Sequence, residues 1–179
     1  MQSNIIKNFI RRKIFKIDEK GIHFFHFIRF SAFPAKSMAV FIQAIGEKSG
    51  DNFLFDLGFE AGKLAAVENI KGVKLEKVPI NLRMNLLNNL LEVVGFGKFD
   101  FKIFNKEKNK GLVHYTNNPV IEEACKLYGN KSKSCIFYSS VFSAHAEVEL
   151  GLKNVRLKET QCICKGSKFC EWSHNISEK

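Results

Sequence analysis

Cysteines are concentrated near the carboxyl end of this 179-residue chain, and their spacing constrains what the chain can fold into. Four of the five cysteines lie in the last 45 residues: Cys135, Cys162, Cys164 and Cys170. Cys162 and Cys170 flank Gly166 symmetrically, which predicts a β-hairpin over 155–172 whose two thiols face each other. Side chains opposed in this way are about 5 Å apart, so two thiolates can share one zinc ion.

Two further residues complete a candidate tetrahedral site. Cys135 is predicted to lie in the first turn of a helix capped by Ser132 or Ser134, where the positive helix terminus favours the thiolate. Glu159 precedes Cys162 by three residues. Its carboxylate therefore reaches the same site only if a bulge or a strand end lies between the two. Four such ligands leave no open coordination position, which is typical of structural zinc.

The other two cysteines have different expected places. Cys164 shares a strand face with Cys162 and is a rival ligand, whereas Cys125, near the end of a short helix, is predicted to be a core residue. The alternative to a metal site is that these are half-buried free cysteines. The amino-terminal segment carries its charges after a short apolar stretch, the reverse of a secretory signal, so we expect a cytoplasmic protein. In that compartment clustered cysteines hold metal more often than they form disulfides.

The pattern of elements predicts an α+β fold with a mainly antiparallel sheet. A hydrophobic content of 45% and a charged content of 26% indicate a globular chain, and the length suits one domain over 1–179. The predicted elements, in chain order, are an amphipathic helix over the first ~13 residues, a hairpin over 14–30, helices over 34–50, 51–65 and 82–93, strands over 98–104 and 112–116, helices over 119–128 and 132–151, and the final hairpin.

Charge and motifs exclude several classes of function. The net charge of +10 is scattered over the chain, which is typical of a solvated surface and argues against nucleic-acid binding. No apolar run approaches the ~20 residues of a membrane span. Gly95 and Gly97 lack the remaining glycine and the helix of a phosphate-binding loop, and no nucleophile motif is present.

Two other patterns, the phenylalanine-rich segments and a pair of glycines, each allow two interpretations, and the histidines and glutamates show no evident pair. Phenylalanines, 18 in all, gather in 24–33, 53–59 and 96–104, where they line either an apolar cavity or the core. Gly58 and Gly62 lie four apart on one helix face, which serves either helix packing within the chain or dimerisation. The histidines, His114 and His145 among them, have no partner close in sequence, and Glu147 and Glu149 cannot face each other on a helix.

Cys135, followed by Glu159-x-x-Cys162-x-x-x-Gly166-x-x-x-Cys170-Glu-Trp, resembles the carboxyl-terminal signature of the 4-vinyl reductase domain family. That family includes a bacteriochlorophyll-pathway protein and the sensor domains of phenol-responsive transcriptional activators, and its fold is similar to that of transport-particle (TRAPP) subunits. The match is clearest over 117–174. It implies a zinc site at the positions of Cys135, Glu159, Cys162 and Cys170, which favours Cys162 over Cys164.

The chain departs from the family in the helix that follows the first cysteine. Family members tend to carry glycines there, whereas this chain has Ser139, Ser140, Ser143 and Ala144. This difference bears on how that helix packs near the expected pocket.

These observations together predict a cytoplasmic, zinc-stabilised domain that binds a small apolar or aromatic ligand as a sensor or carrier. One alternative is a homodimeric assembly or adaptor module, and dimerisation is expected in either case. The other is a reductase acting on a tetrapyrrole vinyl group. No nicotinamide or flavin motif is present and the expected zinc has no free position, so we expect no catalytic residues.

Overall fold

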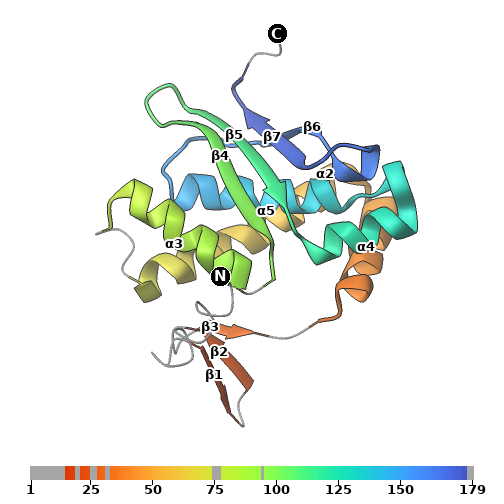
Figure 1. Cartoon of the computed structure of the whole chain (residues 1–179), viewed down its shortest axis with the longest axis horizontal. Helices are drawn as coiled ribbons and strands as arrows, with labels where there is room; N and C mark the ends of the chain where they lie inside the picture. The colour runs from red at the N-terminus through yellow and green to blue at the C-terminus, as the bar shows by residue number, and fades with distance from the viewer. Residues whose placement is uncertain are drawn as a thin grey trace.

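The computed structural model describes residues 15–18, 21–24, 28–30, 33–73, 78–93 and 95–176. Within them the chain forms two antiparallel sheets and four α-helices (Figure 1). The α+β class predicted from the sequence is therefore confirmed. The predicted amphipathic helix over the first ~13 residues lies outside the described residues.

The first sheet contains three short strands rather than the two predicted for 14–30. β1 (Phe15–Asp18) pairs with β2 (Gly21–Phe24), and β2 pairs with β3 (Ile28–Phe30). The expected second arm folds back on itself, because Phe24 pairs with Ile28 only four residues later. This sheet lies below the main body in Figure 1, at the start of the first long helix.

Two long helical segments follow. α2 (Ala35–Val73) is interrupted at Gly50, whose φ of 85° lies outside the helical region, so it consists of two helical arms meeting where the sequence placed a boundary. Glycine adopts such a φ without the penalty that a Cβ brings. α3 (Ile80–Val93) comes next, and the chain turns at Gly95 into the second sheet.

The second sheet carries the carboxyl-terminal half of the molecule. Its strands are β4 (Lys98–Asn105), β5 (Lys110–Thr116), β6 (Lys158–Gln161) and β7 (Cys170–His174), in the order β4-β5-β7-β6 with every pair antiparallel. Between β5 and β6 lie α4 (Pro119–Tyr128), the 3-10 turn η2 (Gly129–Lys131) and α5 (Ser134–Val148). A second 3-10 turn, η3 (Ile163–Lys165), connects β6 to β7.

α5 and α2 lie behind this sheet in Figure 1, and the core fills the space between helices and sheet. On β7, Cys170 and Trp172 are almost fully buried. The Trp172 ring packs against Tyr115 of β5 and Phe142 of α5, with ring centroids 4.9 and 5.8 Å apart. Aromatic pairs at these distances add to the free energy of burial.

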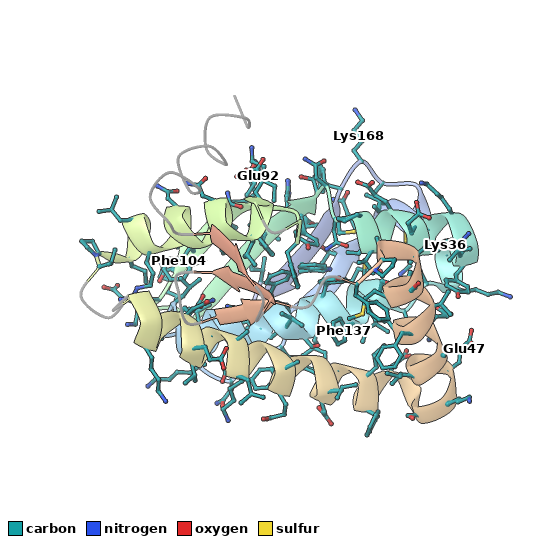
Figure 2. The ribbon with its side chains drawn as sticks, turned by 90° about the horizontal axis from the view of Figure 1, so that it is seen from below. Lys36, Glu47, Glu92, Phe104, Phe137 and Lys168 are labelled. Carbon is teal, nitrogen blue, oxygen red and sulfur yellow. A yellow bond between two sulfur atoms is a disulfide. The ribbon has the colours of Figure 1, made fainter. Side chains whose placement is uncertain are left out.

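The two helices approach closely at the small residues that the sequence singled out. A Cβ on Gly58 would lie 2.8 Å from the carbonyl oxygen of Phe137, and one on Gly62 would lie 2.8 Å from the Cα of Val141. The face with Gly58 and Gly62 is therefore packed against α5 of the same chain. The interpretation as internal packing is confirmed, and dimerisation through these glycines is wrong because α5 already covers that face. Figure 2 shows Phe137 in this region beside α2.

Serines on α5 complete the same contact. Ser139, Ser140 and Ser143 are almost fully buried, and each hydroxyl donates to a backbone carbonyl of the preceding turn. Ser143 also accepts a hydrogen bond from the backbone N–H of Leu157, which anchors the segment leading into β6. Their hydroxyls are thus paired while the side chains stay small enough for α2 to approach.

Within the described residues, none of the helices combines the length and the apolar character needed to cross a bilayer.

Candidate metal centre and apolar cavity

Three cysteine thiols from three different elements meet in the interior. The Sγ of Cys135, at the start of α5, lies 3.2 Å from that of Cys162 and 3.4 Å from that of Cys170. Cys162, which precedes η3, and Cys170, the first residue of β7, have their sulfurs 3.9 Å apart. Each of the three side chains is at most 3% exposed. The thiols therefore form a compact buried triad.

The electrostatics of the triad favour at least one thiolate. Hydrogen bonds from Cys135 and then Cys170 hold the pKa of Cys162 well below its ordinary value. The same bonds, together with burial, raise the pKa of Cys135. Cys135 also lies in the first turn of α5, as predicted, where the helix dipole stabilises negative charge. The helix begins at Ser134, whose backbone N–H donates a hydrogen bond to Ser132 Oγ at 3.3 Å, so of the two predicted caps Ser132 contributes.

Glu159 is brought to the edge of the triad by a β-bulge. The register between β6 and β7 shifts between Glu159 and Gln161, the interval in which a bulge was required for its carboxylate to turn inward. The Glu159 carboxylate lies close enough to the thiols of Cys135 and Cys162 to have its own pKa affected by both and to affect the pKa of Cys162. The carboxylate also pairs with Lys165 at the surface of the turn. Burial raises the pKa of Glu159 more than the Lys165 ammonium lowers it.

The remaining two cysteines lie apart from the triad and are bonded to each other. Cys125 of α4 and Cys164 of η3 form a disulfide, with Cα atoms 4.7 Å apart. The interpretation of Cys164 as a rival ligand is therefore wrong in this structure, and Cys125 is not simply a core residue. The cause is η3: residues two apart share a face in a strand, but successive residues of a 3-10 helix are rotated by about 120°, which turns Cys164 away from Cys162.

The spacing of the three thiols fits a metal ion. Three thiolates bound to one tetrahedral zinc at about 2.3 Å have sulfurs about 3.8 Å apart, close to the separations of 3.2–3.9 Å here. The triad is the group of potential ligands that lies close enough to hold a metal ion within the described part of the chain. Three buried cysteines can therefore bind a metal at the start of the final hairpin.

A separate apolar cavity of about 60 Å³ lies between the second sheet and the helices α3 and α5. This exceeds the roughly 10–15 Å³ that one water molecule needs. Phenylalanines form much of the wall: Phe99, Phe101 and Phe104 of β4 and Phe142 of α5. A bulge in β4 between Phe101 and Ile103 interrupts the odd-position alternation predicted for this strand, so that Phe104 lines the cavity. Phe104 lies on the α3 side of the molecule (Figure 2).

Three polar side chains interrupt the apolar wall: Asn88, whose Oδ1 accepts a hydrogen bond from the backbone N–H of Phe99, and the pair His145 and Glu149. His145 Nδ1 lies 3.0 Å from the Oε2 atom of Glu149, one helical turn later. The Glu149 side chain is 1% exposed, and its Oε1 atom accepts a hydrogen bond from Asn69 Nδ2 of α2 at 3.1 Å. Both His145 and Glu149 line the cavity. Despite this distance, His145 Nδ1 makes no hydrogen bond of good geometry among the described residues, so the polarity of this buried ring is not fully satisfied by the protein.

The sequence reasoning missed this pair. It assigned no partner close in sequence to His145, which is wrong because His145 and Glu149 are spaced i, i+4, a spacing that places two side chains on one helix face. That signal was present in the sequence. It was correct that Glu147 and Glu149 diverge, since Glu147 accepts a hydrogen bond from the backbone N–H of Val155 instead. His114 pairs with Glu171 of β7 across the sheet.

Solved structures with the same fold include two that agree with the resemblance found in the sequence. The phenol-responsive sensory domain of the transcription activator PoxR, crystallised with phenol, is 13% identical with a TM-score of 0.72, covering 97% of this chain and 89% of its own. A vinyl-4-reductase family protein from Methanocaldococcus jannaschii is 15% identical with a TM-score of 0.50, covering 80% and 82%. At these identities the likeness establishes the fold. No family model matches the sequence, and no curated protein matches it significantly.

Proposed function

We propose that this chain is a zinc-stabilised domain that binds a small aromatic molecule and acts as a sensor or carrier. The observation that carries the proposal is the cavity, which is lined by α3, β4, β5 and α5 and whose wall is mainly apolar, with Asn88, His145 and Glu149 as its polar side chains. Binding sites for small molecules have this composition, a mainly apolar wall with a few polar groups that fix orientation.

The pair His145 and Glu149 favours a ligand that is a small ring with a single hydrogen-bonding group. The His145 ring can form a hydrogen bond with a hydroxyl group in the cavity, while the phenylalanines contact the aromatic ring of the ligand. The Glu149 carboxylate lies beside the His145 ring and is itself held by a hydrogen bond from Asn69. The PoxR domain, whose crystal structure contains phenol, supports a ligand of this class.

We propose that zinc is held by Cys135, Cys162 and Cys170, with Glu159 as the fourth ligand. The thiol separations support tetrahedral coordination, and three thiolates with a carboxylate form a donor set that zinc accepts. Release of Glu159 from Lys165 is needed before its carboxylate can bind the ion. A site closed in this way stabilises the fold and does not bind substrate, which agrees with a binding domain.

The expectation of a homodimer stays a prediction, as do the cytoplasmic location and the single domain over 1–179. Exposed apolar side chains on the outer face of α2, among them Phe53, Leu57 and Leu64, support this helix as the place of contact. A monomer in light scattering at high protein concentration would contradict the dimer.

Thermal shift measurements test the ligand proposal on the metal-loaded protein. Phenol is expected to raise the melting temperature, and to do so more than benzene, because only phenol offers a hydroxyl to His145. The Ala146→Leu variant fills part of the cavity and should lose the phenol-induced shift. Ala61→Leu, at an exposed position of α2, is the matched control and should keep it. Equal shifts in the wild type and in Ala146→Leu, or no shift with any small aromatic, would contradict the proposal.

A further inference from the structure

The bonded pair Cys125–Cys164 connects two elements that carry different parts of the molecule. Cys125 lies near the end of α4, and Cys164 is the middle residue of η3, the turn between β6 and β7. Figure 1 shows this turn beside α4. The disulfide therefore fixes the metal-bearing hairpin to a helix that contributes none of the triad thiols.

The pair differs from the triad in accessibility. Cys125 and Cys164 are both partly exposed, whereas Cys135, Cys162 and Cys170 are buried. A dissolved disulfide or a reductant can therefore reach the pair more readily than the triad, since thiol–disulfide exchange requires access to the sulfur atoms. The structure thus separates two sets of cysteines, one accessible and bonded, the other buried and free.

From this arrangement we propose that Cys125 and Cys164 are a reversible redox modification site that locks η3 onto α4. Oxidation proceeds by exchange with a low-molecular-weight disulfide such as glutathione disulfide. The thiolate of one cysteine attacks the disulfide and releases one glutathione thiolate, and the second cysteine displaces the other. Two electrons pass from the cysteine pair to the oxidant, the two cysteine protons go to solvent, and a phosphine reductant reverses the change.

The position of the bond in the chain gives it a consequence for the metal site. The loop that it closes spans 39 positions and contains α5 and β6, and with them Cys135, Glu159 and Cys162, whereas Cys170 lies outside it. In the oxidised form η3 cannot leave α4, so the segment between Cys162 and Cys170 stays in place. The disulfide should therefore slow release of the metal ion from the oxidised protein. This consequence rests on the proposed metal site.

Mass mapping of the full-length metal-loaded protein tests the disulfide itself. In excess glutathione disulfide the chain should lose about two mass units, assigned to a linked peptide pair containing Cys125 and Cys164, and the phosphine should restore both thiols. Linkage among Cys135, Cys162 and Cys170 in place of this pair would overturn the proposal. So would a pair that stays reduced in excess oxidant, or one that stays oxidised in excess phosphine under native conditions.

Stability and metal release supply the second readout. We expect the oxidised form to melt about 5–15 °C above the reduced form and to transfer its metal to a chelator about tenfold more slowly. Cys125→Ser and Cys164→Ser should remove both differences, while Ser167→Ala in the same turn, the matched control, should keep them. An oxidised and a reduced wild type that melt together would overturn the lock. If the protein purifies without any bound metal and still shows the redox-dependent melting shift, the zinc proposal is contradicted and the disulfide proposal is not.

Discussion

Single residues decide how closely α2 and α5 pack. Gly58 and Gly62 face the backbone of Phe137 and Val141, and the small side chain of Ser140 lies on the opposing surface of α5. The sequence predicted a small-residue face from the four-residue spacing. It could not identify the partner, because spacing within one helix carries no information on which other helix approaches it.

A methyl group at Gly62 should therefore destabilise the fold. In Gly62→Ala the new Cβ would meet the backbone of Val141, which cannot move without shifting a helix. We expect a loss of about 1–3 kcal/mol in the free energy of unfolding, although alanine has the better helix propensity by about 1 kcal/mol. Urea denaturation measures it, with Lys63→Ala on the exposed side of α2 as the control. A more stable Gly62→Ala protein would contradict the close approach.

At the scale of elements, the β6–β7 hairpin shows what spacing can and cannot predict. The symmetric placement of Cys162 and Cys170 about Gly166 correctly indicated a hairpin, and the register shift lies in the interval where a bulge is needed for Glu159 to turn towards the triad. The connection between the strands is not a simple tight turn, because η3 inserts a 3-10 turn after Cys162. That turn separates Cys164 from Cys162, and strand periodicity does not describe it.

The same hairpin is linked to β5 through a carboxylate. Thr160 of β6 donates to Glu171 of β7, and His114 of β5 lies 2.8 Å from the same side chain. These contacts, the hydrogen bond from Thr160 first, hold the pKa of Glu171 below its ordinary value of about 4.5. The folded state thus favours the carboxylate over the acid.

This lowered pKa predicts an acid-dependent contribution to stability. It is complete above about pH 4.5, the ordinary value, and is lost as the pH falls through the lowered value. Glu171→Gln should reduce the free energy of unfolding at pH 7 by at most about 1 kcal/mol, since solvent screens a surface group. The difference from the wild type should shrink towards pH 3 in urea titrations. A difference that grows on acidification would contradict the assignment.

At the scale of the whole molecule, the cavity depends on contacts that the sequence does not reveal. Phenylalanines were correctly noted as candidates for a cavity or a core, and they serve both: Phe99 is buried in the core and also lines the cavity. The wall combines α3, β4, β5 and α5, together with Leu152 and Leu157 of the connecting segment. Residues so distant in sequence come together only through the sheet order and the packing of α5.

Metal removal should affect the stability of the whole molecule. Elemental analysis of the purified protein is expected to find about one zinc per chain, and a chelator should lower the melting temperature by about 10 °C, because the metal binds the folded state. Cys170→Ser should lose the metal, whereas Cys125→Ser should retain it. A zinc content unchanged in Cys170→Ser would contradict the proposed ligands.

The strand order has a consequence for how the chain folds as it is synthesised. β7 is the last strand of the described chain, yet it lies between β5 and β6. Until β7 has left the ribosome, the strand-pairing edges of β5 and β6 have no neighbour, and such edges are prone to pair with other chains. Cys170, the last of the three triad cysteines, arrives on the same strand. Completion of the sheet and of the metal site therefore coincide, and a nascent chain that stalls before residue 170 has neither.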